Sequence, residues 1–438
     1  MRSEHRFAEL GNCLSLVIDH RGKTPKKLGS DWVTGGVPTV SANNVRDGRL
    51  VDEDSIRYVT HNVYKRWMKN EDVQRGDCLL VSEGATLGQC MYWDEEYPIV
   101  LGQRLFCLRA NPQVLYSRYL YFYMTSHSFQ SEVVARSTGT SVPGLRQTEV
   151  LKLKIRLPPI EDQRIIGDIL YKLNKKIDLN RRMNETLEAM ARALFKSWFV
   201  DFDPVRTKME GREPGLPTPL ADLFPDSFED SELGEIPRGW EAGALGDFLY
   251  QRVERCAASP ETAARPYVPI DCISAKSLFL SESKPGEEAQ SSLTKFYKGD
   301  ILFGAMRPYF HKVCIAPFDG TTRTTAFVLY PRQADDFAFA TLQLHHPDTI
   351  DFATRHSTGS TIPYAVWTDS LDTMPVVAPS QDIRKAFNHL VRPILARIPE
   401  PYFENRTLAT LRDTLLPKLI TGELRVGFTC KLAQEITS

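Results

Sequence analysis

The sequence predicts an α+β protein: two β-rich domains, each followed by a long helix, with the two helices packed antiparallel as a coiled coil around a pseudo-two-fold internal repeat. Three observations lead to this fold class. A set of short segments recurs after more than 200 residues, apolar runs alternate with turn residues, and two long apolar stripes have helical spacing. The chain of 438 residues, with a hydrophobic fraction of 42%, has ample material for two cores.

The repeat is carried by four segments in the same order. Residues 137–143 (Ser-Thr-Gly-Thr-Ser-Val-Pro) recur as 357–363 (Ser-Thr-Gly-Ser-Thr-Ile-Pro). The other repeated positions are Gly76-Asp77 with Gly299-Asp300, Pro159, Asp162 and Arg164 with Pro379, Asp382 and Arg384, and Asn184, Thr186 and Leu187 with Asn405, Thr407 and Leu408. A period of this length is too long for a solenoid or propeller and indicates duplication of a whole domain with its helix.

Residues 1–157 form the first predicted domain and residues 236–378 the second. In the first, the strands are marked by apolar runs such as 78–81 and 105–108 between Gly, Asp, Asn and Pro, and residues 117–134 predict an embedded helix. The second domain follows the same plan, with strands at 301–303, 313–315 and 326–330 and a helix over 337–355.

The two spacer helices are predicted over residues 158–200 and 379–425, leaving 426–438 as a tail. Each follows a proline and has acidic residues in its first turn, where they suit the positive end of the helix dipole. Pro399 and Pro401 predict a kink or a split in the second helix. The apolar stripes predict that the helices pack against each other; the alternative is that each stripe covers only its own domain.

Charge is distributed unevenly, although the formal net charge is only −1. Residues 201–241 carry eleven acidic and four basic side chains, and residues 201–235 are predicted to be a Pro- and Gly-rich linker. Residues 1–157 carry 21 basic and 17 acidic side chains. This distribution permits nucleic-acid binding without requiring it.

Several classes of function lack their signals. The eight cysteines are scattered without a CxxC pair, so we expect reduced thiols and no metal site. No secretory signal and no long apolar run are present, which predicts a cytoplasmic location and no membrane partner. A phosphate loop, a GxSxG elbow, an HExxH pair, a dinucleotide GxGxxG and the Asn/Asp-Pro-Pro-aromatic segment of adenine methyltransferases are all missing, which favours recognition over catalysis.

Four segments together resemble the specificity (S) subunits of type I restriction–modification systems, over essentially the whole chain. They are Leu157–Arg164 (LPPIEDQR), Leu194–Val205 (LFKSWFVDFDPV), Glu232–Trp240 (ELGEIPRGW) and Leu415–Leu424 (LLPKLITGEL). The second helix departs from the pattern, since Ile383 stands where the first repeat has Gln163.

The resemblance implies a non-catalytic DNA-binding subunit. Each β-rich domain is then a target recognition domain for one half of a bipartite, asymmetric site, and the helices set the spacing and dock two methyltransferase (M) subunits. Restriction (R) subunits complete the complex. This chain is expected to bind no cofactor, because S-adenosylmethionine, ATP and Mg would belong to the partner subunits.

Candidate DNA-binding residues combine basic side chains, amides and hydroxyls, which serve phosphate contacts and base recognition. In the first domain they are Arg21, Lys23, Lys26, Lys27, Asn43, Asn44, Arg46, Ser137, Thr138 and Arg146. In the second they are Lys276, Arg307, Tyr309, Lys312, Arg323, Ser357 and Thr358. The repeated Ser-Thr-Gly loop is expected to contact only phosphates, because base-reading residues should differ between the two domains.

Two other interpretations stay open at this point. The first is a self-contained DNA methyltransferase or nuclease with cryptic motifs. The second is a scaffold whose helices recruit proteins and whose β-rich domains do not recognise DNA.

Overall fold

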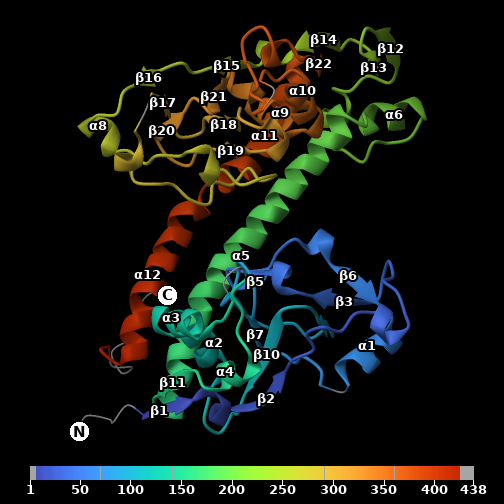
Figure 1. Cartoon of the computed structure of the whole chain (residues 1–438). Helices are drawn as coiled ribbons and strands as arrows, with labels where there is room; N and C mark the ends of the chain where they lie inside the picture. Colours follow the sequence, from blue (N-terminus) through green and yellow to red (C-terminus); the bar gives the residue numbers. More distant parts are fainter. Residues whose placement is uncertain (1–5, 70, 140–141, 291, 360, 425–438) are drawn as a thin grey trace. The chain divides into compact units, whose positions relative to one another are not determined.

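The computed structural model describes residues 6–69, 71–139, 142–290, 292–359 and 361–424. Their contacts divide the chain into two compact units: unit 1, Met1–Lys176 with Leu408–Ser438, and unit 2, Ile177–Thr407. Two long helices contribute residues to both units, α5 (Ile160–Phe199) and α12 (Pro401–Thr421) (Figure 1). Each unit is described by itself.

Unit 1 is built around a four-stranded antiparallel sheet in the order β2-β10-β7-β8. Its strands are β2 (Leu14–Ile18), β7 (Cys78–Val81), β8 (Cys90–Tyr92) and β10 (Leu105–Ala110). Smaller sheets are formed by β3 (Val37–Val40), β6 (Arg57–Val59) and β9 (Val100–Leu101), by β1 (Arg6–Glu9) with β11 (Lys154–Leu157), and by β4 (Val45–Arg46) with β5 (Arg49–Leu50). The helices are α1 (His61–Met68), α2 (Ser117–Thr125), α3 (His127–Arg136) and α4 (Gln147–Leu151).

Both faces of this sheet are buried, which explains the continuous apolar runs of β7 and β10. Because strand side chains alternate between faces, Cys78 and Leu80 enter one core cluster together with residues of α2 and α5. Leu79 and Val81 enter another, together with Val37, Val100 and other residues of the small sheet. A strand buried on both sides needs apolar residues at every position.

Unit 2 repeats the main parts of this plan. Its main sheet, in the order β15-β21-β18-β19, contains β15 (Leu249–Gln251), β18 (Ile301–Gly304), β19 (Val313–Ile315) and β21 (Ala326–Pro331). Smaller sheets are formed by β16 (Arg255–Cys256), β17 (Leu293–Phe296) and β20 (Gly320–Arg323), and by β14 (Glu241–Ala244) with β22 (Pro375–Ala378). The helices are α8 (Pro260–Ala263), α9 (Phe337–His345), α10 (Pro347–Arg355) and α11 (Gln381–Arg397). The shared strand orders confirm the internal repeat.

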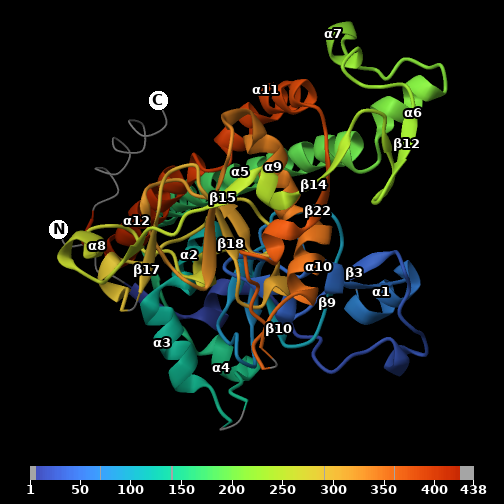
Figure 2. The ribbon, with the colours of Figure 1, turned by 90° about the horizontal axis from the view of Figure 1, so that it is seen from above.

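The long helix α5 has 40 residues, about 60 Å at the standard rise. In unit 1, Ile166 and Leu170 are buried in the same cluster as Leu419 and Ile420 of α12. In unit 2, Phe195 and other aromatic residues of α5 pack against α11, which also lies beside α9 (Figure 2). The apolar stripe of α5 therefore does both things considered above: it packs against the other spacer helix and it covers domain cores.

Hydrogen bonds along α5 give the direction of the pairing. In unit 1, Arg412 donates to Asn174 at 2.9 Å. In unit 2, Asn180 donates to Glu404 at 2.7 Å and to Asn405 at 2.8 Å. Residue numbers rise on α5 as they fall on α12, so the helices are antiparallel, as predicted.

The predicted break in the second spacer helix is confirmed. Helix α11 ends at Arg397 and α12 begins at Pro401. A proline removes a backbone donor and clashes with the preceding turn, so the residues around Pro399 and Pro401 leave carbonyl groups without helical partners.

Two predicted segments differ from the structure in detail. Each embedded helix is divided in two, because Ser126 caps the start of α3 and Pro347 begins α10. The predicted linker 201–235 is folded on unit 2: it contains α6 (Asp203–Met209), α7 (Thr218–Ala221), β12 (Phe228–Ser231) and the first residues of β13 (Gly234–Pro237), and it buries Phe202, Val205 and Phe224 in the main core. Its apolar residues, spaced among prolines and acids, anchor it.

Among the described residues, no helix is long and apolar enough to cross a membrane.

Candidate functional site

Loops gather at one end of the main sheet in unit 1, and we call this end edge 1: residues 19–27, 82–86, 102–104 and 138–146, of which 140 and 141 lie outside the described residues. The strand register brings them together, because Leu105 at the start of β10 pairs with Val81 at the end of β7. Backbone hydrogen bonds continue the contact: Ser82 donates to Arg104 at 2.9 Å, and Leu145 donates to Ser82 at 2.8 Å.

Gln103 holds two of the predicted DNA-binding segments together. Its side-chain amide accepts from the Gly22 amide at 3.1 Å and donates to the Lys23 carbonyl at 2.6 Å. Its own carbonyl accepts from Ala42 at 3.1 Å. Gln103 is thus hydrogen-bonded to both the basic loop 20–27 and the segment 41–46, which lie apart in the sequence.

A polar cavity of about 510 Å³ opens at edge 1, lined by Asp19, Arg21, Gly22, Glu83, Gln103 and Arg104. Arg21 lies 4.3 Å from the centre of the Phe106 ring and pairs with Asp19 at 2.7 Å. Burial by itself raises the pKa of Asp19, but the hydrogen bonds from Arg21 outweigh it and lower the pKa below its ordinary value. The cavity therefore offers both fixed acceptors and fixed donors, which base edges require.

Several predicted basic residues of unit 1 are already engaged in protein contacts. Lys23 lies 3.2 Å from the His20 ring nitrogen, and partial burial together with nearby Lys69 lowers its pKa. Lys27 donates to the Gly22 carbonyl at 2.6 Å. Lys26 and Arg146 are exposed, and both remain predicted phosphate contacts.

Asn44 requires a correction. Its side chain is 3% exposed and closes a capping box with Ser41, accepting from the Ser41 amide at 3.1 Å and donating to the carbonyls of Val51 and Asp52. With its amide engaged on every side, Asn44 shapes the loop and is not placed to contact a base. Its neighbours Asn43 and Arg46 are exposed and stay predictions.

The corresponding end of the main sheet in unit 2, edge 2, consists of Lys276 and residues 305–312, 323–325 and 357–366, with residue 360 outside the described part. Lys276, Tyr309 and Arg323 are exposed there. Lys312 is engaged, since its ammonium donates to the Ile270 carbonyl at 2.8 Å. Edge 2, as defined, includes every residue predicted in the second domain, and their contacts with DNA stay predictions.

The repeated Ser-Thr-Gly loop has the same geometry in both units. Thr138 exchanges backbone hydrogen bonds with Gly144, as Thr358 does with Tyr364. Gly139 and Gly359 both have positive φ, 107° and 91°, and an added Cβ would lie 2.5 and 2.7 Å from a carbonyl oxygen of the same loop. Glycine is therefore required at this turn.

The serines of this loop have a structural role. Ser137 donates to the Val134 carbonyl at 2.8 Å and Ser357 to the Ala353 carbonyl at 2.7 Å, so each hydroxyl bonds a carbonyl in the last turn of a helix. The loop is shared scaffold, while its neighbours at the two edges differ.

Sequence reasoning missed Gln103, Arg104, Glu83 and Phe310. Only their position in the sequence could have indicated them, because each lies near the end of a strand and close to a candidate DNA-binding segment. Arg104 has positive φ, 61°, and lies 3.8 Å from Glu83. Such a backbone conformation is unusual for arginine, and only the structure reveals it.

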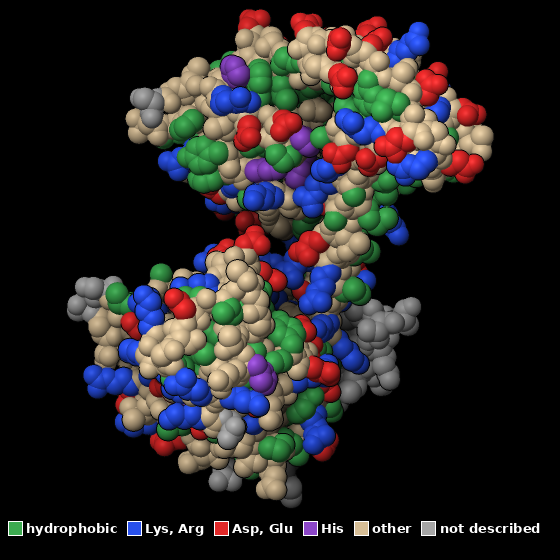
Figure 3. Space-filling view, turned by 90° about the vertical axis from the view of Figure 1, so that its right-hand side faces the viewer, with side chains coloured by type: hydrophobic (Ala, Val, Ile, Leu, Met, Phe, Trp, Pro, Cys, Tyr) green, Lys and Arg blue, Asp and Glu red, His purple; other side chains and the backbone are tan. Residues whose placement is uncertain are grey.

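Surface charge is uneven between the units. On the face in Figure 3, Lys and Arg are spread over unit 1, while many Asp and Glu side chains lie on unit 2. Among the described residues, no group of three or more His, Cys, Asp or Glu could hold a metal ion.

Comparisons with known proteins agree with this architecture. A family model described as the type I restriction modification DNA specificity domain matches residues 7–189. The HindI specificity subunit of Haemophilus influenzae is 25% identical over 407 residues, which cover 80% of this chain and 87% of the relative. The MjaIX specificity subunit of Methanocaldococcus jannaschii is 27% identical over 329 residues, or 71% and 69% of the two chains.

A solved structure has the same fold. The type I restriction–modification S subunit from M. genitalium superposes with a TM-score of 0.58 at 14% identity, covering 96% of this chain and 97% of that one. The duplicated β-rich units with antiparallel helices are the fold that this structure shares with the chain. Residues 7–189 match the DNA specificity domain of type I restriction–modification systems, and most of the chain is similar to specificity subunits of such systems.

Proposed function

We propose that this chain is the DNA-specificity subunit of a type I restriction–modification complex, with edge 1 and edge 2 each contacting one half of a bipartite site. The observation that carries the proposal is the pair of equivalent loop edges. The same backbone scaffold occurs twice, and it carries different side chains each time.

The difference between the edges accounts for an asymmetric target. Edge 1 offers a polar cavity with Arg21, Glu83 and Gln103, whereas edge 2 offers Arg307 with the exposed aromatic residues Tyr309 and Phe310. Because base pairs present distinct donor and acceptor patterns in the major groove, two different side-chain sets select two different half-sites.

The exposed cations have a separate task. Lys26, Arg146, Lys276 and Arg323 are suited to phosphate contacts, which position a protein on DNA without selecting sequence. Replacing one of them should weaken binding to all sequences alike and lower the salt dependence, by about one unit of the logarithmic slope.

In the proposed complex, α5, α11 and α12 set the separation of the half-sites and dock two methyltransferase subunits. Those subunits bind S-adenosylmethionine and carry out methylation of adenine, and restriction subunits supply ATP- and Mg-dependent cleavage. We assign no catalytic step and no cofactor to this chain. We also infer a cytoplasmic location, where such a complex meets DNA.

The test is a methylome. Long-read sequencing of cells that make this chain with its methyltransferase should show a split, asymmetric motif methylated on adenine, and the motif should vanish when only this chain is deleted. An unchanged methylome would overturn the proposal. Edge variants should then alter one half of the motif only: Arg104→Ala changes one half, and Arg307→Ala the other.

Matched controls lie at the opposite end of each main sheet. Arg75 and Lys298 occupy equivalent turns that precede β7 and β18, and both are exposed. Alanine at either position should leave the motif unchanged. If the controls alter the motif as much as the edge variants do, the edges are not the recognition surface.

One further measurement separates the alternatives. Methyl transfer by the purified chain alone, given S-adenosylmethionine and DNA, would support an enzyme in place of a specificity subunit. An assembled complex that binds DNA without any sequence preference would support a scaffold.

A further inference from the structure

The turn 307–311 at edge 2 has an unusual backbone. Arg307 and His311 flank a short 3-10 helix, Pro308–Phe310, and both have left-handed conformations, with φ of 53° and 52°. Non-glycine residues avoid this region because Cβ approaches the carbonyl oxygen. Of the nine such residues among those described, Arg104, Lys276, Arg307 and His311 lie at the two edges. Backbone strain of this kind concentrates at functional sites.

Edge 1 shows that the strain at Arg307 is avoidable. The amide of Arg307 donates to Pro363 at 2.8 Å, and the amide of Gly84 donates to Pro143 at 3.0 Å, so the two residues occupy the same position of the repeat. Gly84 takes its φ of 100° without steric cost. An arginine at the equivalent position indicates that its side chain has a task which glycine cannot perform.

The strained turn presents two aromatic side chains to solvent. Tyr309 is 49% exposed and Phe310 is 44% exposed, and their ring centres lie 4.9 Å apart in an edge-to-face arrangement. Ile362 of the neighbouring Ser-Thr-Gly loop is 45% exposed. At the equivalent place in unit 1, the turn Gly84-Ala85-Thr86 has no aromatic residue.

The turn is held firmly. His311 donates its amide to Pro308 at 2.8 Å and accepts from Lys276 at 2.7 Å through its carbonyl, while its ring packs on His345 at 4.4 Å between ring centres. Pro308 is buried. Because the turn is rigidly supported, its exposed aromatic side chains can be inserted into another surface without a change of the backbone. A flexible loop would be displaced instead.

We propose that Tyr309 and Phe310 form an aromatic wedge that enters a base step of the half-site contacted by unit 2 and partly unstacks it. The inference rests on the proposed function. Cationic residues lie at the same edge: the Arg307 guanidinium lies 6.0 Å from the centre of the Phe310 ring, Arg323 is exposed, and the backbone amide of the exposed Lys276 donates to the His311 carbonyl. Apolar side chains inserted between bases, flanked by cations on phosphates, unstack and kink DNA in other proteins. Unit 2 thus recognises the deformability of its DNA half-site in addition to base edges, whereas unit 1 recognises base edges alone.

The experiment uses the chain assembled with its methyltransferase partner. Duplexes of the methylated motif carry 2-aminopurine, whose fluorescence rises on unstacking, at one position at a time. The methylated adenine itself is left out, because methyltransferases flip that base. We expect a rise at one step, or at two adjacent positions, within a single half-site.

The variants decide the outcome. Tyr309→Ala with Phe310→Ala should remove the rise and weaken specific binding roughly tenfold. Tyr250→Ala is the matched control, since Tyr250 is 44% exposed at the far end of the same sheet, and it should keep the rise. A rise that persists in the double variant, or its absence everywhere in a complex that binds specifically, overturns the wedge. Failure of the unaltered complex to select any sequence overturns the proposed function as well. If the double variant no longer assembles with the methyltransferase, the aromatic residues are a protein contact instead.

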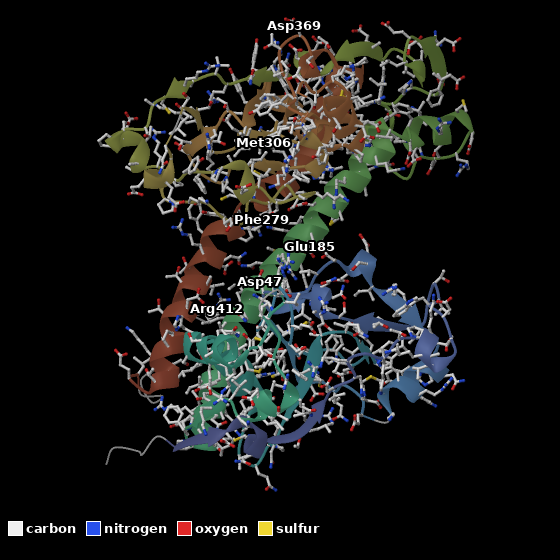
Figure 4. The ribbon with its side chains drawn as sticks, in the orientation of Figure 1. Asp47, Glu185, Phe279, Met306, Asp369 and Arg412 are labelled. Atoms are coloured by element: carbon white, nitrogen blue, oxygen red, sulfur yellow. The ribbon has the colours of Figure 1, made fainter. Side chains whose placement is uncertain are left out.

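Arg307→Gly supplies an independent readout. It should fold at least as stably as the unaltered chain, because it relieves the strained conformation, yet lose affinity and the fluorescence rise. Asp369→Gly is the control: Asp369 also has positive φ, 56°, and lies away from the labelled edge residue Met306 (Figure 4). Unchanged DNA binding in Arg307→Gly would show that the side chain has no role at the wedge.

Discussion

The side-chain amide of Asn184 donates a 3.0 Å hydrogen bond to the carbonyl oxygen of Ile398, in the break between α11 and α12. The carbonyl is one of those that the proline break leaves without a helical partner, and Asn184 itself is 2% exposed. A polar side chain on α5 thus completes the end of a helix that is distant in the sequence.

Replacing Asn184 with alanine should destabilise unit 2 by about 1–3 kcal/mol, because a buried carbonyl loses its donor. The free energy of unfolding, from urea titration followed by circular dichroism, measures the effect. Thr186→Ala is the control on the same helix: its hydroxyl bonds within α5 and is exposed, so the change should stay within about 0.5 kcal/mol. Equal losses of unfolding free energy in the two variants would contradict a stabilising role of the Asn184 hydrogen bond to Ile398.

Glu188 makes the stability of unit 2 dependent on pH. It is 3% exposed, and its Oε1 accepts from Ser277 at 2.8 Å, Leu278 at 3.0 Å and Phe279 at 3.2 Å. Burial raises the pKa of Glu188 above its ordinary value, although these hydrogen bonds oppose the shift. The folded state therefore holds the proton more tightly than the unfolded state does.

The sign of the effect follows from that difference. The stability that Glu188 contributes is present below the pKa of the unfolded chain and is lost as pH rises through the raised pKa of the folded chain. Glu188→Gln should therefore gain stability relative to the unaltered chain as pH increases from about 4 towards 7, measured by urea midpoints. Glu185→Gln, with a carboxylate exposed on the same helix (Figure 4), should show no such trend.

Gln103→Ala should loosen edge 1. The variant loses the bonds to Gly22 and Lys23 that hold the basic loop, so amide hydrogen exchange over residues 20–27 should accelerate, and the half of the motif assigned to unit 1 should become degenerate. Selection at the other half should stay intact. A motif relaxed equally in both halves would contradict the local role assigned to Gln103.

Substitutions of Gly139 and Gly359, the glycines of the repeated Ser-Thr-Gly loop, should affect different half-sites. Gly139→Ala and Gly359→Ala each force a Cβ against a carbonyl oxygen in a left-handed turn, at a cost of about 1–3 kcal/mol, and each should impair one half-site. Gly35→Ala, where nothing lies within 4 Å of the added Cβ, is the control and should retain both. Methylation of reporter plasmids, each mutated in one half-site, separates the outcomes.

Repetition and patterning made the fold predictable. Segments of two units that align at a near-constant interval, such as Gly76-Asp77 with Gly299-Asp300, showed the duplication, and both aspartates are buried. Their partners were not predictable. Asp77 binds Arg109 on β10, whereas Asp300 binds Arg252 next to β15, so the same carboxylate position receives its arginine from a different strand in each unit.

The candidate site was predicted only in outline. Side-chain chemistry pointed equally to Lys26, Arg307 and Asn44, because the sequence does not distinguish an amide that closes its own loop from one that faces solvent. The DNA contacts of Lys26 and Arg307 stay predictions. Gln103 escaped notice because its task depends on contacts between segments about 80 residues apart. Hydrogen bonds that close loops are decided by tertiary structure.

Unit 1 contains residues from both ends of the chain, and this has a consequence for biosynthesis. Unit 2 is continuous from Ile177 to Thr407, but unit 1 needs residues after Leu408, including Leu419 and Ile420, to complete its core. On the ribosome, the part encoded first is therefore finished last, and the later unit has all its residues before the earlier one does. Until then the apolar residues of unit 1 that Leu419 and Ile420 cover stay exposed, so a stall during synthesis of α12 leaves a nascent protein with an incomplete core.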